Sequence, residues 1–443
     1  MRKREDVNEE LARKRRKRLR HGVAAAVLAA AACLTALLLF LGSLGRTATE
    51  APAIQPTESL SETQPTQTVP PTEPVADTAP ETTQPPTDPQ PPETVSAQER
   101  AGSLLASMSR TEKIYQLFIV RPETLTEDKT QAVEGLSDIL DAQSVGGIVL
   151  FSGNVENPEQ CTALIASFQS ASPLPLFVAV DEEGGSVSRL ASNPAMGMTQ
   201  FPSMGEVGQS RSREDAYQVG LTIGGEIRAL GFNLDFAPVA DVNSNPDNPV
   251  IGSRAFSDDP EVAADLVSGC VWGFYDAQVI SCLKHFPGHG DTAADTHLGY
   301  AETGKSLGEL EETELLPFRA GLQAGCPMVM VGHIACPKVT GDTAPASLSP
   351  RLVQGLLREE LGFQGVVVTD AMEMGAITEA YPAGEAAVLA LEAGCDLILL
   401  PENLPEAAGA LEEALDSGRL TEARLDESVR RILELKLQYG IIP

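Results

Sequence analysis

The chain has 443 residues, of which 32 are basic and 62 acidic, and its charge is unevenly distributed. Ten basic and four acidic residues lie in residues 1–21, which leaves 22 basic and 58 acidic residues, a net charge of −36, for residues 22–443. A body this acidic repels phosphate backbones, so we expect no nucleic acid among its partners.

Residues 22–44 are almost wholly apolar, with only Thr35 and Ser43 as polar interruptions. About 20 such residues cross a bilayer as a helix, and the basic cluster before them predicts that residues 1–21 stay in the cytoplasm. A cleaved signal peptide is the alternative, but the apolar run is longer than a usual signal core and no clear A-x-A site follows it. We therefore expect a single-pass anchor in the cell membrane, with the rest of the chain extracytoplasmic.

Residues 45–96 are rich in Pro, Thr, Gln and Glu, and 12 prolines lie between Pro52 and Pro92. With so few large apolar side chains, this segment cannot offset the entropy cost of ordering, and its prolines favour extended conformations. It is expected to be a disordered linker that holds a domain, residues 97–443, away from the membrane.

Seven short apolar runs in residues 97–443 predict buried parallel strands. They are residues 145–151, 174–180, 232–239, 279–286, 328–334, 365–368 and 396–400. Between them, amphipathic segments predict helices over residues 212–230, 259–275, 307–324, 349–361 and 383–393. The alternation of strands and helices indicates an α/β fold, namely a (β/α)8 TIM-like barrel. Because an eighth strand is not evident, we expect that the barrel could be irregular. A doubly wound open sheet is the alternative, but no G-x-G-x-x-G motif follows the first strand.

Titratable residues lie near or just after the ends of four of the expected strands. They are Asp181 with Glu182 and Glu183, Lys284 with His285, His333, and Asp370. In a barrel the loops after the strands form one face, which carries the chemistry, so these side chains are expected to lie together.

The segment 284–297, KHFPGHGDTAADTH, contains three of the protein's five histidines. One interpretation is a solvated loop whose histidines cap turns. Another is a metal site, because His285 and His289 are four residues apart, but Pro287 and Gly288 prevent a regular helix there. The metal interpretation is the weaker one, and we expect no metal and no other cofactor.

A third interpretation of this segment is acid/base catalysis. In Asp295-Thr296-His297 the carboxylate can accept the Nδ1–H of the imidazole and leave Nε2 for the substrate. Histidine suits this role because its ordinary pKa, about 6.5, lies near working pH. Its partner would be Asp370, a lone acid at the end of an apolar strand, although an N-cap of the following helix is an equally simple role for that residue.

These motifs make the chain resemble the β-N-acetylglucosaminidase branch of glycoside hydrolase family 3, over essentially all of residues 100–443. The most specific shared motif is K-H-F-P-G-H-G followed by D-x-H, present in residues 284–297. Supporting motifs lie at residues 181–185 with Arg189, 234–242, 252–256 and 369–372. The sequence departs from the usual family pattern at Glu182, Ser186 and Thr296.

The resemblance implies that Asp370 is the nucleophile, His297 the acid/base and Asp295 the residue that orients it. It also implies that the sugar is held by Asp181, Arg189, Arg254, Lys284, His285 and His333. The expected activity is that of a retaining β-N-acetylhexosaminidase that acts on GlcNAc-containing glycans. It would remove terminal β-linked N-acetylglucosamine from cell-wall (peptidoglycan) fragments or related oligosaccharides. We expect a monomer. A phosphorylase and a non-catalytic sugar-binding surface protein are the alternatives.

Overall fold

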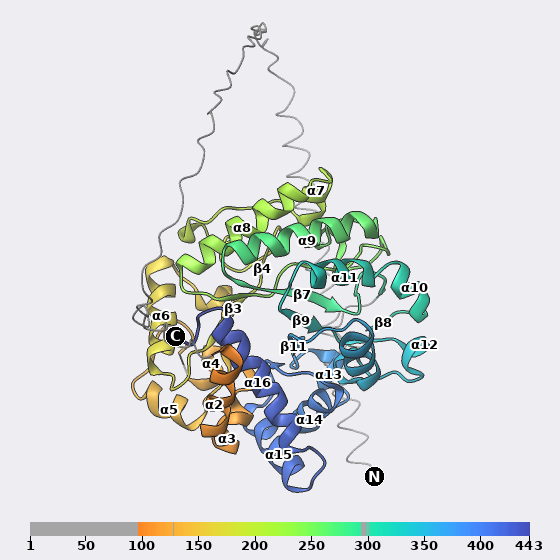
Figure 1. Cartoon of the computed structure of the whole chain (residues 1–443). Helices are drawn as coiled ribbons and strands as arrows, with labels where there is room; N and C mark the ends of the chain where they lie inside the picture. The colour runs from red at the N-terminus through yellow and green to blue at the C-terminus, as the bar shows by residue number, and fades with distance from the viewer. Residues whose placement is uncertain (1–95, 127, 294–298, 300) are drawn as a thin grey trace, which may run out of the picture. The chain divides into compact units, whose positions relative to one another are not determined.

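The computed structural model describes residues 96–126, 128–293, 299 and 301–443 (Figure 1). The expected cytoplasmic segment and anchor, and the linker apart from Ser96, lie outside these residues, as do Asp295 and His297. Among the described residues, no helix combines the length and the apolar character needed to cross a bilayer. The predicted anchor, residues 22–44, is therefore not tested by this observation.

Eight parallel strands form the central sheet, in the order β11-β9-β7-β6-β3-β2-β1-β12. The strands are β1 (Phe118–Val120), β2 (Gly147–Val149), β3 (Phe177–Val180), β6 (Leu234–Asp235), β7 (Ile280–Phe286), β9 (Met328–Val331), β11 (Val366–Thr369) and β12 (Ile398–Leu399). A bridge between Val368 and Leu397 joins the two ends of this order, and Thr369 N donates to Leu397 O at 3.0 Å. The nearly closed sheet confirms the expected TIM-like barrel, and the doubly wound alternative is wrong.

The strand that the sequence did not reveal is β1. It has three residues and lies between Gln116, which caps α3 (Arg110–Tyr115), and the Arg121-Pro122 pair that begins α4 (Pro122–Leu125). Such a short run has no periodicity of its own. Its pairing with β2 and β12 places it in the sheet.

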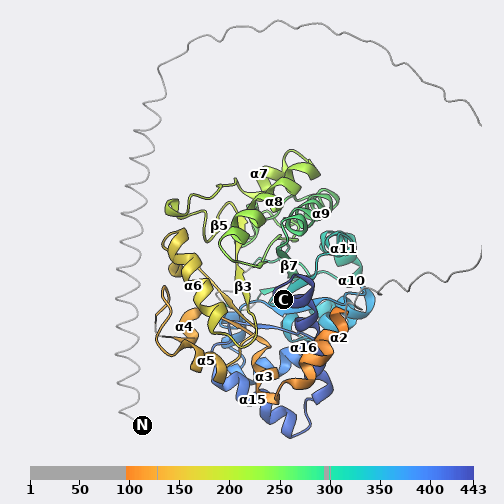
Figure 2. The same cartoon turned by 60° about the vertical axis from the view of Figure 1, so that its left-hand side comes forward.

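Helices surround the sheet in both views (Figures 1 and 2). Besides α3 and α4, the longer ones are α2 (Ala97–Ser107), α5 (Leu136–Ala142), α6 (Pro158–Ala171), α8 (Arg213–Ala229), α9 (Pro260–Asp276), α10 (Leu307–Glu312), α11 (Leu315–Gln323), the π-helical η5 (Arg351–Glu360), α14 (Ala383–Ala393), α15 (Leu404–Asp416) and α16 (Glu422–Gln438). Shorter helices are α7 (Met204–Gly208), α12 (Pro337–Thr340) and α13 (Gly375–Thr378). Polar caps set several starts: Asp259 Oδ1 accepts the N–H of Glu261 at 3.1 Å, with Pro260 at the first helical position.

The helix expected over residues 307–324 is two helices, which corrects the sequence-based expectation. α10 ends at Glu312, with Thr313 as its C-cap, and α11 begins at Leu315. Pro317 explains the break, because a continuous helix would need its missing N–H to reach the Thr313 carbonyl. In the first turn of a new helix that N–H is not required.

The strands are buried along their whole length, including all seven residues of β7. Burial on both sides is expected for parallel strands that have side chains inside the barrel and helices outside it. In β7, however, the buried residues include Lys284 and His285. Burying such polar groups is costly unless they are paired, so the end of β7 points to a site.

Candidate active site

A cavity of about 300 Å³ lies at the C-terminal ends of the strands. Its polar lining residues are Arg121, Asp181, Glu183, Arg189, Arg254, Lys284, His285, His289, Asp370 and Glu373. Six of the residues expected to form the site therefore lie together: Asp181, Arg189, Arg254, Lys284, His285 and Asp370. The volume is at the small end of the range for small-molecule sites, which suits one sugar ring better than a chain of them.

Lys284 is the centre of a buried ion network on one wall of the cavity. Its Nζ lies 2.7 Å from Asp181 Oδ1 and 2.6 Å from Glu183 Oε1. Glu183 in turn accepts two hydrogen bonds from Arg254, from Nε at 2.8 Å and from Nη2 at 2.7 Å. Two cations and two carboxylates thus fix one another and present several donors and acceptors to a ligand.

The network also fixes the charges of its members. Burial favours the neutral amine of Lys284, but Asp181 and Glu183 outweigh it and hold the lysine pKa above its ordinary value. Burial likewise favours a neutral Glu183, whereas Lys284 and Arg254 hold the pKa of that carboxyl well below its ordinary value. Both groups are therefore charged at neutral pH. Glu183, which was expected at this face but was not among the residues expected to hold the sugar, is part of this wall.

Asp241 is a second residue to which the sequence gave no role. This buried carboxylate, in the loop after β6, lies 2.7 Å from His285 Nδ1 through Oδ2. Its Oδ1 accepts the backbone N–H of His289 at 2.6 Å. Asp241 therefore fixes both the ring of His285 and the backbone that follows it.

Asp370 follows β11 directly and is held by the backbone on both sides. Its N–H donates to Val331 O at 2.9 Å, and its Oδ1 accepts the N–H of Ala371 at 2.8 Å. Burial raises the pKa of this carboxyl, but electrostatic interactions with His285 and His333 and the hydrogen bond from the Ala371 N–H outweigh burial, so its pKa lies below the ordinary value. The result is a carboxylate that is ionised in the cavity.

His333 is not among the residues that line the cavity. Its Nε2 is 3.0 Å from the Ala371 carbonyl and its Nδ1 is 2.8 Å from Ser347 Oγ. A carbonyl only accepts, so Nε2 carries a proton. The structure thus places this expected sugar contact against the backbone next to Asp370.

Phe151, Arg121 and Glu373 form a further wall that the sequence did not indicate. The guanidinium carbons of Arg121 and Arg189 lie 4.7 and 5.4 Å from the centroid of the Phe151 ring. Arg121 Nη1 also donates to Glu373 Oε2 at 2.6 Å. Arg121 follows the unrecognised strand β1, so the missed strand is also the reason that this residue was missed.

Two buried carboxyls, Glu182 and Asp235, lie next to the ion network. Burial raises the pKa of both, and for Asp235 the raised pKa lies well above the ordinary value. Glu182 Oε2 accepts the N–H of Leu190 at 2.7 Å. Glu182 therefore fixes the segment that carries Arg189.

Asp295 and His297, the expected acid/base pair, lie outside the described residues. Their segment is flanked by described residues that contact each other, because Thr303 Oγ1 donates to Asp291 Oδ2 at 2.7 Å. Within the part of the chain that the structure describes, no group of three or more His, Cys, Asp or Glu side chains could hold a metal ion. The roles of Asp295 and His297 remain predictions.

Residues 110–435 match the family described as the glycosyl hydrolase family 3 N-terminal domain. The chain belongs to glycoside hydrolase family 3. This match, which covers most of the chain, confirms the resemblance to family 3 drawn from the motifs.

Several known proteins share more than a third of their aligned residues with this chain. Beta-hexosaminidase A from Pseudoalteromonas piscicida is 37% identical over 68% of this chain and 54% of its own length. A beta-hexosaminidase from Stenotrophomonas maltophilia is 38% identical over 62% of this chain and 82% of its own. The structure of a family 3 beta-N-acetylglucosaminidase from Paenibacillus sp. is 39% identical, with a TM-score of 0.72, over 76% of this chain and 64% of that one. The chain thus spans little more than half of the first relative.

Proposed function

We propose that this family 3 protein is a retaining β-N-acetylhexosaminidase that removes terminal β-linked N-acetylglucosamine. The observation that carries the proposal is Asp370, a carboxylate kept ionised at the end of β11 in a cavity of about 300 Å³. Retaining glycosidases need such a nucleophile beside the anomeric carbon. The names of the relatives, beta-hexosaminidase and beta-N-acetylglucosaminidase, support the choice of sugar.

The wall of Asp181, Lys284 and Arg254 is suited to hold the ring hydroxyls. Carboxylate oxygens accept from hydroxyls, and ammonium and guanidinium groups donate to them. Because the network fixes these groups before a ligand arrives, little ordering is left to be done on binding. A cavity that fits one ring favours removal of a terminal unit over cleavage within a chain.

In the first step the Asp370 carboxylate bonds to the anomeric carbon while the bond from that carbon to the leaving oxygen breaks. His297, as imidazolium, gives its proton to the leaving oxygen, and Asp295 supports the charge of the imidazolium. In the second step neutral His297 takes a proton from water, whose oxygen bonds to the anomeric carbon and releases Asp370. Each step inverts the anomeric carbon, so the two steps together retain the β configuration.

Phosphorolysis is the variant that this mechanism leaves open. A neutral histidine in place of a second carboxylate puts no additional negative charge next to the incoming nucleophile, so phosphate could replace water. We propose hydrolysis, because the relatives named above are hexosaminidases and acetylglucosaminidases.

We further propose that the enzyme acts outside the cytoplasm on cell-wall fragments, as a membrane-anchored monomer. The support is the sequence alone: the basic residues 1–21, the apolar residues 22–44 and the Pro-rich residues 45–96. In that compartment the expected substrate is N-acetylglucosamine linked to N-acetylmuramic acid.

The test is release of nitrophenol from the aryl β-N-acetylglucosaminide and from the aryl β-glucoside, each with and without phosphate. We expect the N-acetylglucosaminide to be the faster substrate, free N-acetylglucosamine to be the product, and phosphate to have no effect. A sugar phosphate as the main product would identify a phosphorylase. Absence of turnover with both substrates would favour the sugar-binding protein.

A further inference from the structure

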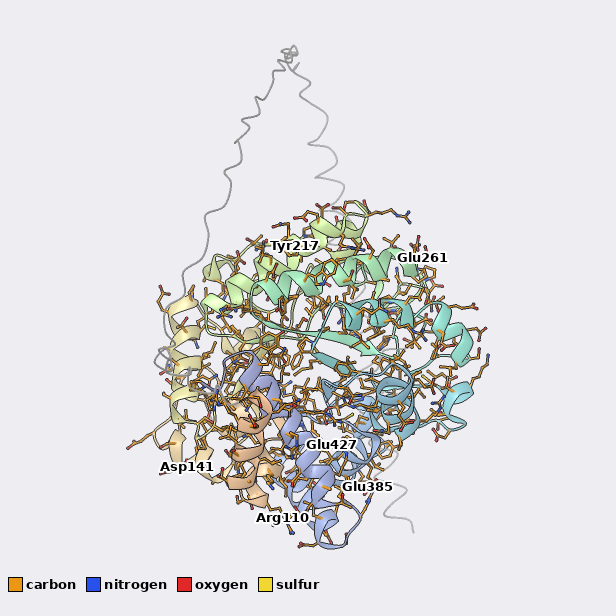
Figure 3. The ribbon with its side chains drawn as sticks, viewed as in Figure 1. Arg110, Asp141, Tyr217, Glu261, Glu385 and Glu427 are labelled. Atoms are coloured by element: carbon orange, nitrogen blue, oxygen red, sulfur yellow. The ribbon has the colours of Figure 1, made fainter. Side chains whose placement is uncertain are left out.

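A second cavity, of about 570 Å³, lies on the outside of the barrel and shares no lining residue with the first. It is a groove between α9 and α11, with Arg213 from the start of α8 at its edge. Figures 1 and 2 both show α9 beside α8 and α11 on the outer surface of the domain. In Figure 3, Glu261 at the start of α9 and Tyr217 of α8 lie at this outer edge.

Trp272, the only tryptophan of the chain, lines this groove and is 42% exposed. Among the described residues, the large apolar side chains that are exposed are Trp272 and Tyr275. The guanidinium carbon of Arg213 lies 5.3 Å from the Trp272 ring centroid, which holds the indole in place. An exposed and fixed aromatic ring is a ready surface for a ligand with an apolar face.

The charges around Trp272 indicate which kind of ligand fits. Arg213 is paired with Asp265, and Arg319 Nη2 lies 3.0 Å from Glu311 Oε1. Both cations are therefore already balanced by carboxylates. With a net charge of −30, the chain also repels acidic partners, including a second copy of itself.

A pyranose matches these features. Its ring carries C–H groups on its flat face, which can stack on an indole, and its hydroxyls lie at the edge. In the groove, the edge of the ring would meet Ser268, Asp265 and Gln323, whose side chains donate or accept hydrogen bonds without adding uncompensated positive charge.

We propose that the groove between α9 and α11 is a second glycan-binding site, in which β-linked N-acetylhexosamine units stack on Trp272. The choice of sugar rests on the function proposed above, whereas the groove itself does not. Binding a glycan chain at a point away from the catalytic cavity raises the local concentration of chain ends for that cavity.

Because Trp272 is the only tryptophan, its fluorescence reports on the groove directly. A chito-oligosaccharide is titrated into the full chain that carries Asp370→Ala, so that it is not consumed. We expect a saturable change in Trp272 emission. Ala320→Glu, which fills the groove from α11 and keeps the reporter, is expected to weaken that binding about tenfold or more, which separates the groove from the catalytic cavity.

Retention on an insoluble glycan gives a second readout. We expect Trp272→Ala to bind insoluble chitin about five- to tenfold more weakly than wild type. Tyr275→Ala is the matched control, because Tyr275 is 61% exposed on the same helix but does not line the groove. It is expected to bind like wild type. With Asp370 present, the variants Ala320→Glu, Trp272→Ala and Tyr275→Ala are all expected to turn over the aryl monosaccharide substrate at the wild-type rate.

Three results would overturn the proposal. The first is Trp272 emission that stays constant during the titration of the Asp370→Ala chain. If the wild type still hydrolysed its substrate, the proposed function would stand and only the groove would be rejected. The second is equal retention of the Trp272→Ala and Tyr275→Ala variants. The third is a Trp272 that acrylamide cannot quench in the free protein, because the groove would then be covered by another segment or a second copy. An emission change in the Asp370→Ala chain, together with no hydrolytic activity in the wild type, would support the groove and contradict the proposed function.

Discussion

The ring of His285 lies against Asp241, with Nδ1 2.7 Å from Oδ2. Because an ionised carboxylate only accepts, this contact places the proton on Nδ1. In the neutral ring Nε2 then accepts, and it lies 3.4 Å from Arg254 Nη2 at the cavity wall. Asp241 therefore determines which nitrogen of His285 carries the proton and which one faces Arg254.

Asp241→Asn should lower both stability and activity. Hydrogen bonds to a charged group contribute about 1.5–3 kcal/mol each, so we expect at least that loss in the free energy of unfolding and a fall in kcat/KM of about 10–100-fold. Urea unfolding and steady-state kinetics measure the two effects. Asp247→Asn is the control, since Asp247 is an exposed acid in the same loop. If both variants matched wild type, Asp241 would have no positioning role.

Glu183→Gln should destabilise the domain by on the order of 3 kcal/mol at neutral pH, because it leaves buried Lys284 and Arg254 with too little negative charge. The effect should depend on pH. The pKa of Glu183 is depressed in the folded state, so its stabilisation is complete above the unfolded-state pKa of about 4.3 and is lost as pH falls toward the folded-state pKa.

The difference in unfolding free energy between wild type and Glu183→Gln should therefore shrink as the pH is lowered below about 4. Glu373→Gln is the control, because Glu373 lines the same cavity but is exposed. A difference that stayed constant from pH 7 to pH 3 would mean that Glu183 does not act through its charge.

Much of the site was predictable because parallel strands end on one face of a barrel. Asp181, Lys284, His285 and Asp370 each follow or end an apolar run that is long enough to recognise. Arg121 was not predictable, because β1 has only three residues and its place is set by pairing with β2 and β12.

Other parts of the site depend on contacts between distant segments. Asp241 and His285 are 44 positions apart, and their contact follows from the parallel pairing of β6 and β7. The sequence predicted that His333 lies at the end of a strand. It could not predict the orientation of the His333 side chain, which its contacts with Ser347 and Ala371 determine. Local pattern cannot supply such information.

Removal of the His297 imidazole should slow substrates with poor leaving groups most. General acid catalysis contributes typically 10²–10⁴-fold, and an activated aryl leaving group needs less of it in the first step. Asp295→Asn should also be slow, and the double variant should be little worse than either single one. Kinetics on aryl and alkyl N-acetylglucosaminides measure this. Activity that is lost in chelator and restored by zinc would support the metal interpretation instead.

The topology can be tested on intact cells. We expect added protease to remove the domain after about residue 97 and to spare residues 1–21, because the basic cluster keeps that end inside. Immunoblotting with tags at both ends measures this. A domain protected from protease, or one released with its N-terminus near residue 47, would show that residues 22–44 are not a lasting anchor.

The most direct test of the account is to identify the residue that becomes covalently attached to the sugar. A fluorosugar inactivator based on N-acetylglucosamine should form a stable ester with Asp370, seen as one labelled peptide by mass spectrometry, and Asp370→Ala should be inactive, unlabelled and folded. Glu373→Ala, which removes a second acid of the same cavity, should still be labelled at Asp370. A label on any other acid, or substantial turnover by Asp370→Ala, would contradict the proposed mechanism.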